Sequence, residues 1–199
     1  MPHQLLYEDE FYHLYNRGNN GENLFYNHEN YIYFLKKYDF YLSDYIDTYA
    51  YCLLPNHFHL LIRVKQFDSF PKEDSKLAYE YRCSEQFRRF FMSYAKAINK
   101  QQERTGSLFE NAFKRKQVNS EVYMSRLICY IHTNPRKHGI TDDFQNYLYS
   151  SYNRILDERI SKLKKKEVIE WFGGKESFSK THSESQIDLI NDDWVIEDE

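Results

Sequence analysis

Two histidines separated by one residue stand inside an apolar segment, residues 53–64, which reads LLPNHFHLLIRV. Side chains in a β-strand alternate between its two faces, so we expect His57 and His59 to point one way and Phe58 the other. Neighbouring imidazoles can bind a metal ion, or they can simply hydrogen-bond to their neighbours on a half-buried strand. The pair is therefore a candidate for half of a metal site.

A second segment, residues 130–139 (YIHTNPRKHG), could supply a nucleophile and another ligand. Tyr130 and Asn134 are four residues apart and would lie on one face of a helix, whereas His132 and Thr133 would point elsewhere. If that face packs against the histidine strand, two imidazoles, an amide oxygen and a phenol surround a common point. Such a donor set with open positions suits Mn²⁺ or Mg²⁺, because a closed structural zinc site would use more sulfur or histidine.

A cation in such a site can polarise a phosphate oxygen while the phenol attacks phosphorus. A phenol with an ordinary pKa of about 10 is a poor nucleophile at neutral pH and needs a base or a cation to help it. Neither segment contains Asp or Glu, so we expect the metal to supply most of the effect. Tyr123, two helical turns before Tyr130, is a competing nucleophile. Lys137 and His138 could contact phosphate, or could merely complement the dipole at a helix end.

Length and composition indicate one domain of ordinary size, since 199 residues can bury a substantial core. Cys52, Cys83 and Cys129 are isolated from one another, which is typical of reduced thiols in a cytoplasmic protein. No window approaches the roughly 20 apolar residues of a membrane helix, and the first residues lack the order of a signal peptide. The sequence therefore predicts a cytoplasmic protein that does not bind a membrane.

The net charge of −3 conceals an asymmetry along the chain. Residues 82–137 carry twelve Lys or Arg against four Glu and no Asp, whereas residues 184–199 carry seven acids and no base. A basic middle and an acidic end are compatible with a groove for a polyanion, or with two solvated surfaces that have no partner. Aromatic residues make up 18% of the chain, with 19 Tyr, and tyrosines interleaved with Lys and Arg can stack on unpaired bases.

Periodicity predicts the elements that must position these groups. Pro55 and Asn56 join two expected strands, either as a tight hairpin or as a bulge in one strand. Ser120 is expected to cap a helix that ends just before Asn134 and Pro135. The expected strands are 10–17, 45–54, 57–64 and 107–118, and the expected helices begin at Asn27 or His28, span 76–103, and span 120–133.

That order is the ferredoxin-like split βαβ arrangement, an α+β fold with an antiparallel sheet, plus one added helix that carries Tyr130. We assign residues 1–152 to this domain and residues 153–199 to a helical, acidic C-terminal extension that could belong to the same domain. Beyond Gly139, residues 147–156 look helical, and a short amphipathic piece ends at Gly173 and Gly174.

Five segments in this order resemble the single-tyrosine transposases of the HUH endonuclease superfamily, most closely the REP-associated tyrosine transposase branch. The resemblance covers residues 11–152 and includes YNRGNNGENLF, the His-x-His strand, GSLFENAFKRK, the YIHTNPRKHG helix end and a following SSY. It implies that His57 and His59 bind the metal and that Tyr130 is the nucleophile. Asn134 falls where the superfamily places a polar third ligand.

The resemblance also implies an activity. Such enzymes cut single-stranded DNA next to a hairpin, form a 5′-phosphotyrosine, release a 3′-OH and rejoin strands by the reverse transesterification without ATP. The implied cofactor is Mg²⁺ or Mn²⁺, the implied partner is single-stranded or hairpin DNA, and the chain is expected to be a monomer or a homodimer.

Several basic or polar residues are candidate DNA contacts, although each could equally be a solvated charge at the rim. Two other functions remain open at this point: a domesticated hairpin-binding protein without strand transfer, and an unrelated metallohydrolase or structural metal site. The candidate contacts are Arg17, Asn56, Arg63, Lys114, Arg115, Lys116 and Lys137.

Overall fold

A computed structural model describes residues 5–72, 78–110 and 113–184, so most of the acidic end, residues 185–199, lies outside the described residues. The short 3-10 helices are η1 (Asn19–Gly21), η2 (Phe67–Ser69) and η4 (Phe144–Asn146). The strands are β1 (Phe11–Arg17), β2 (Ile46–Leu53), β3 (His57–Val64) and β4 (Lys114–Val118). The α-helices are α1 (His28–Leu42), α2 (Tyr79–Gln101), α3 (Glu121–Lys137), α4 (Tyr152–Leu156), α5 (Lys165–Trp171) and α6 (Lys175–Glu184).

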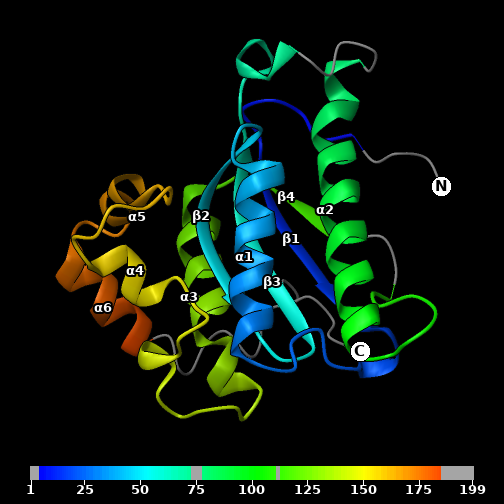
Figure 1. Ribbon diagram of the computed structural model, residues 1–199. Helices are drawn as coiled ribbons and strands as arrows, with labels where there is room; N and C mark the ends of the chain where they lie inside the picture. The colour runs from blue at the N-terminus through cyan, green and yellow to red at the C-terminus, as the bar shows by residue number, and fades with distance from the viewer. Residues whose placement is uncertain (1–4, 73–77, 111–112, 185–199) are drawn as a thin grey trace.

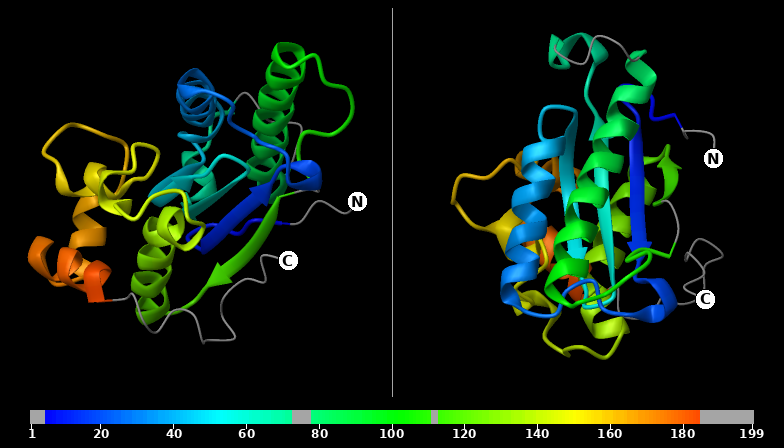
Figure 2. Two further views of the ribbon diagram at one scale, coloured as in Figure 1. Left: turned by 90° about the horizontal axis from the view of Figure 1, so that it is seen from below. Right: turned by 45° about the vertical axis from the view of Figure 1, so that its right-hand side comes forward.

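The four strands form one antiparallel sheet in the order β2-β3-β1-β4. Helices α1 and α2 cover one face of this sheet, and α3 lies on the opposite face with α4 to α6 beside it (Figures 1 and 2). The order of elements and the antiparallel pairing confirm the predicted ferredoxin-like α+β fold.

Strand alternation divides the apolar residues between two cores. Leu14 and Phe58 point to the α1 and α2 side, where they pack with Phe34 and other buried residues. Leu61 belongs to the second core, which also contains Ile128 of α3. Because alternate residues share a face, His57 and His59 lie on the α3 side of the sheet, as the sequence predicts.

The junction at Pro55 and Asn56 is a tight hairpin, which settles the alternative left open by the sequence. Leu54 N–H donates to the His57 carbonyl at 2.8 Å, and the Asn56 carbonyl accepts from Gly18 N–H at 2.7 Å. A Cβ atom at Gly18 would lie 1.9 Å from the carbonyl oxygen of Glu22, so only glycine fits there. The loop after β1 is thereby attached to the end of the sheet that carries the histidines.

Helix α3 continues through Pro135 to Lys137, so the predicted end before Asn134 was wrong. The Gly139 N–H donates to the Arg136 carbonyl and the Ile140 N–H to the Pro135 carbonyl, with Gly139 at φ +64°. These two bonds form a Schellman motif, which ends the helix at the glycine. Pro135 removes one hydrogen bond near the last turn, and this loss is tolerated there. Ser120 occupies the N-cap position, but its side chain makes no capping hydrogen bond.

The strand predicted over residues 107–118 is shorter in the structure, where β4 begins at Lys114. Residues 111 and 112 lie outside the described residues, and Phe109 forms an isolated bridge with Gly18. Among the described residues, the regular ladder with β1 is therefore limited to β4, which brings Lys114 opposite Tyr15 and Lys116 opposite His13. The Glu110 N–H adds a single bond to the Arg17 carbonyl at 3.0 Å.

The C-terminal segment runs along the free edge of β2 and then covers the outer side of α3. Ser150 and Leu163 form isolated bridges with Cys52 and Thr48 of β2. The helix expected over 147–156 is limited to α4, and α6 lies in the extension that was predicted to be helical, although no bounds were predicted for it. In the described part of the chain, no helix combines the length and the apolar character needed to cross a membrane.

Phe178 of α6 is fully buried, and its ring centroid lies 5.3 Å from that of Tyr152 and 4.9 Å from that of Phe172. We expect Phe178→Ala to lower the free energy of unfolding by about 3–5 kcal/mol, because it leaves a cavity in the α3-side core. Chemical denaturation should show one cooperative transition at a lower midpoint. The fully exposed Ile160→Ala should change stability by less than about 0.5 kcal/mol. An unshifted midpoint for Phe178→Ala, or a separate early transition, would contradict a shared core.

Candidate active site and metal centre

The pairing of β1 with β3 brings four aromatic side chains together on the α3 face of the sheet, those of His13, Tyr15, His57 and His59. His59 lies opposite Tyr15 of β1, and His57 lies opposite Arg17. His13 of β1 shares this face because it is two residues from Tyr15. The sheet itself, rather than any loop, therefore holds the imidazole groups in place.

His59 is fully buried, and its Nδ1 lies 3.0 Å from Nε2 of His13. Its Nε2 is also buried and has no hydrogen-bond partner within the described residues. Burial lowers the pKa of His59 well below its ordinary value, and His13 and His57 contribute in the same direction. His59 is consequently a neutral imidazole at physiological pH, which is the form that binds metal ions.

His57 is oriented by its neighbour in the hairpin. Its Nδ1 lies 2.7 Å from Oδ1 of Asn56. An amide oxygen only accepts hydrogen bonds, so Nδ1 carries the proton and Nε2 carries the lone pair. A hydrogen bond of this kind fixes the tautomer and ring orientation of metal-binding histidines. Asn56 therefore orients His57, and its predicted contact with DNA stays a prediction.

Tyr130 of α3 packs edge-on against the imidazole pair. Its ring centroid lies 5.4 Å from that of His59 and 6.3 Å from that of His13, and the residue is 7% exposed. The ammonium of Lys137 lies 4.9 Å from the same ring. The structure thus brings the predicted nucleophile to the predicted metal ligands within one chain.

Asn134 lies one turn after Tyr130, and its Nδ2 donates to the Tyr130 carbonyl at 2.9 Å. This bond orients the amide and leaves Oδ1 available to a ligand. Oδ1 is buried with no hydrogen-bond partner among the described residues. An unsatisfied buried acceptor costs about 1–3 kcal/mol, so it calls for a ligand. His138, at the end of the same helix, packs 4.5 Å from His57 between ring centroids.

The imidazole nitrogens of His57 and His59 and the amide oxygen of Asn134 are suited to bind a divalent cation. Among residues 5–72, 78–110 and 113–184, no cluster of three His, Cys, Asp or Glu side chains is arranged to hold a metal ion, and the amide oxygen of Asn134 is the candidate third donor beside the two imidazoles. His59 Nε2 and Asn134 Oδ1 are buried atoms that could coordinate a metal ion and that make no hydrogen bond in this part of the chain. His57 carries its proton on Nδ1, which leaves the lone pair of Nε2 for a metal ion. Two imidazole nitrogens and an amide oxygen suit Mn²⁺ or Mg²⁺ better than a structural zinc ion.

His13 is a candidate site residue that the sequence analysis missed. It is fully buried, burial lowers its pKa to about 3, and its Nε2 is positioned to accept the Nδ1 proton of His59. We expect His13→Ala to weaken Mn²⁺ binding by about 10- to 100-fold, because it removes the group that orients a ligand. Isothermal titration calorimetry with Mn²⁺ checks this, and His13→Gln, which retains an acceptor, should lose less. Unchanged affinity in a folded His13→Ala protein would contradict the role.

The predicted DNA contacts lie on both faces of the sheet. Lys114 and Lys116 share the face of the histidines, whereas Arg115 points to the other face, where its guanidinium lies 6.0 Å from the Tyr12 ring. Arg17 forms two hydrogen bonds with Glu110, at 2.5 and 2.9 Å. Lys114, Lys116 and Lys137 lie near the site, and Arg17, which is bonded to Glu110, also lies beside it because it is paired with His57.

Two further residues lie away from the histidine pair. Arg63 is four residues beyond His59 on β3, about 13 Å along the strand, and forms an ion pair with Asp47 at 3.0 Å. Tyr123 packs under Lys116, whose ammonium lies 5.7 Å from its ring. The geometry favours Tyr130 over Tyr123 as the group that faces His59.

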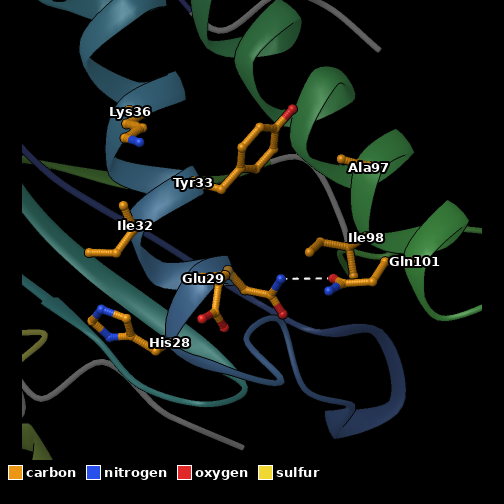
Figure 3. Close-up of a pocket in the computed structure, with 9 residues that line it drawn as sticks. His28, Glu29, Ile32, Tyr33, Lys36, Ala97, Ile98 and Gln101 are labelled. Carbon is orange, nitrogen blue, oxygen red and sulfur yellow. Dashed lines mark hydrogen bonds between the residues drawn. The ribbon is translucent and has the colours of Figure 1, made fainter.

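A hollow of about 630 Å³ lies on the other side of the sheet, between α1 and α2. Figure 3 shows His28, Glu29, Tyr33 and Lys36 on its α1 wall and Gln101 on its α2 wall. The sheet separates this hollow from His57 and His59, so it takes no part in the site described above.

The fold and the site together define a class: a ferredoxin-like domain in which a His-x-His strand faces a tyrosine on an added helix. No family model matches the chain. A Haemophilus influenzae protein that its name describes as a REP-associated tyrosine transposase is 28% identical over 116 residues. The match covers 57% of this chain and 63% of that protein, so the chain spans less than two thirds of the relative's length.

A solved structure of a REP-associated tyrosine transposase bound to a REP hairpin shares the fold, with a TM-score of 0.56 and 15% identity. The alignment covers 78% of this chain and 84% of that one. The first comparison confirms the resemblance to REP-associated tyrosine transposases that the sequence predicts, and the second confirms the fold.

Proposed function

We propose that this chain is a transposase that cuts and rejoins hairpin-associated single-stranded DNA through a covalent 5′-phosphotyrosine at Tyr130. The observation that carries the proposal is the packing of the Tyr130 ring against His59, 5.4 Å between centroids, with Asn134 one turn away on the same helix. The proposed nucleophile and the three proposed metal donors lie on one face of one sheet. A single copy of the chain would therefore hold a complete site, whether it is a monomer or a homodimer.

In the proposed reaction, the phenol oxygen of Tyr130 forms a bond to phosphorus and the bond from phosphorus to the 3′ oxygen breaks. Overall, the phenol proton passes to that leaving oxygen, which gives a free 3′-OH and a 5′-phosphotyrosine. Mg²⁺ or Mn²⁺ held by His57, His59 and Asn134 would polarise a phosphate oxygen. The Lys137 ammonium, 4.9 Å from the Tyr130 ring, adds positive charge where negative charge develops.

The proposed partner follows from the comparisons and from the basic residues. The solved relative is bound to a REP hairpin. In this chain, Lys114 and Lys116 project from β4 on the face of the site, and Lys137 projects from the end of α3. Lysines in such positions bind phosphates without reading sequence, so they support single-stranded DNA as the substrate class and leave the choice of hairpin to other contacts.

A strand-specific label tests the proposal. The protein is incubated with Mn²⁺ and a pool of synthetic hairpins with randomised stems and single-stranded flanks, labelled at either the 5′ or the 3′ end. Denaturing electrophoresis should show an SDS-resistant protein adduct with the 3′ label only, because the tyrosine retains the 5′ phosphate of the downstream piece. The 5′ label should appear in a shorter fragment with a free 3′-OH.

Two results would contradict the proposal. Binding of the hairpins without any adduct in Mn²⁺ or Mg²⁺ would favour the hairpin-binding protein without strand transfer. Cleavage that leaves no protein attached to either label would favour a metallohydrolase that uses water as its nucleophile.

A further inference from the structure

Tyr15 lies between the metal ligands and the edge of the sheet, and neither the proposed reaction nor the comparisons give it a role. In the sheet register it is opposite His59 on one side and opposite Lys114 on the other. Neighbouring strands are about 4.8 Å apart, so the three side chains form a row that runs from the buried site to the sheet edge.

The Tyr15 ring continues an aromatic stack that begins in the site. It is inclined by 24° to the His59 ring at 6.0 Å and by 32° to the His13 ring at 5.1 Å, between centroids. His13 and His59 are fully buried, whereas Tyr15 is partly exposed. The stack therefore runs from the buried metal donors to a partly exposed ring.

A lysine lies beside the partly exposed Tyr15 ring. The ammonium of Lys114, an exposed residue, lies 5.9 Å from the Tyr15 ring centroid. The same pairing recurs one step along β4, where the Lys116 ammonium lies 5.7 Å from the Tyr123 ring. Residues 114 and 116 project on one side of the strand, about 6.6 Å apart. An aromatic surface beside a row of ammonium groups is the arrangement that binds single-stranded nucleic acid, with bases on the rings and phosphates on the cations.

We propose that Tyr15 and Lys114 bind the nucleotide next to the scissile phosphate, with its base stacked on Tyr15 and its phosphate against Lys114. The inference rests on the proposed function, since it takes the scissile phosphate to lie at His57, His59 and Asn134. Every base has a π-face, so this position holds the strand with little preference for sequence. The strand then leaves the site across β4, past Lys116 and Tyr123.

The test measures binding, so that it does not depend on cleavage. Fluorescence anisotropy in the Tyr130→Phe background, with Mn²⁺ present, gives the affinity for a hairpin with a single-stranded flank. We expect Tyr15→Ala to weaken binding by about 5- to 100-fold, the loss of one base stack, and Tyr15→Phe to bind as the parent does. Tyr15→Leu, which retains apolar packing without the ring, should match Tyr15→Ala.

An abasic scan of the flank identifies the stacked base. At one position next to the scissile phosphate, removal of the base should weaken binding to the parent as much as Tyr15→Ala does, and should cause no further loss in Tyr15→Ala itself. Losses that multiply at every position, or a Tyr15→Ala affinity equal to that of the parent, would overturn the inference. An unchanged Mn²⁺ affinity of Tyr15→Ala is expected, and a loss of Mn²⁺ binding would instead assign Tyr15 to the support of His59.

Salt dependence tests the lysine separately. Lys114→Gln should reduce the slope of log affinity against log salt concentration by about 1, the value for one phosphate contact. Lys36→Gln is the matched control, because Lys36 is an exposed lysine of α1 on the other side of the sheet, and its slope should equal that of the parent. Equal slopes for both variants would remove Lys114 from the binding site. The adduct assay reports on the proposed function alone, so failure of either idea is distinguishable.

Discussion

The Tyr130→Phe variant is expected to bind hairpin DNA with unchanged affinity and to form no covalent adduct. The substitution removes one hydroxyl and retains the ring that packs against His59 and under Lys137, so the fold and the metal donors should be unaffected. Removing a covalent nucleophile commonly lowers the rate by roughly 10⁴-fold or more. Adduct formed per hour, measured by denaturing electrophoresis with labelled DNA and Mn²⁺, checks the expectation.

Tyr123→Phe is the matched control for this substitution. Tyr123 lies two turns earlier on α3, beside Lys116 rather than His59, so its loss should leave adduct formation within a few-fold of the parent. The opposite pattern, an adduct that survives Tyr130→Phe and disappears in Tyr123→Phe, would mean that α3 docks two turns away from the position described here.

Substitution of the metal donors should abolish both metal binding and strand cleavage. A bound ion stabilises the folded protein by about 2.7 kcal/mol when its concentration is 100 times the Kd. Mn²⁺ should therefore raise the Tm of the parent, while His59→Ala and Asn134→Leu should show almost no response. Substitution of residues that hydrogen-bond to metal ligands commonly weakens metal binding by about 10- to 100-fold. We therefore expect loss of a ligand itself to weaken Mn²⁺ binding by more than about 100-fold.

Two variants sharpen this comparison. Asn134→Asp retains an oxygen donor and adds a negative charge, so it should retain the Mn²⁺ response that Asn134→Leu loses. His28→Ala removes an exposed histidine on the α1 side of the sheet and should respond to Mn²⁺ as the parent does. A full Mn²⁺ response in His59→Ala would place the ion elsewhere.

The fold was largely predictable, because the order of strands and helices allows few topologies. The errors occurred where a local rule competed with tertiary structure. Pro135 was taken as the end of α3, yet the left-handed Gly139 ends the helix two turns after Tyr130. The bounds of α6 were not predicted because its sequence, KESFSKTHSE, has few apolar residues, and the helix is held mainly by the burial of Phe178 and His182.

The site was predictable where its residues share one element. His57 with His59, and Tyr130 with Asn134, could be placed on common faces from spacing alone. His13 could not be assigned, because its role depends on which strand lies beside β1 and in what register. The opposite orientations of Lys114 and Arg115 were available from strand periodicity, but their inclusion in one basic run obscured it.

The most direct measurement for the central claim is the identity of the residue that carries the DNA. The adduct formed with Mn²⁺ is digested with nuclease and protease, and the peptide that bears a nucleotide 5′-phosphate is sequenced by mass spectrometry. The structure predicts a phosphotyrosine at Tyr130, in an amount that depends on Mn²⁺ and on His59. Attachment at Tyr123, at Tyr15 or at any residue outside α3 would contradict the account.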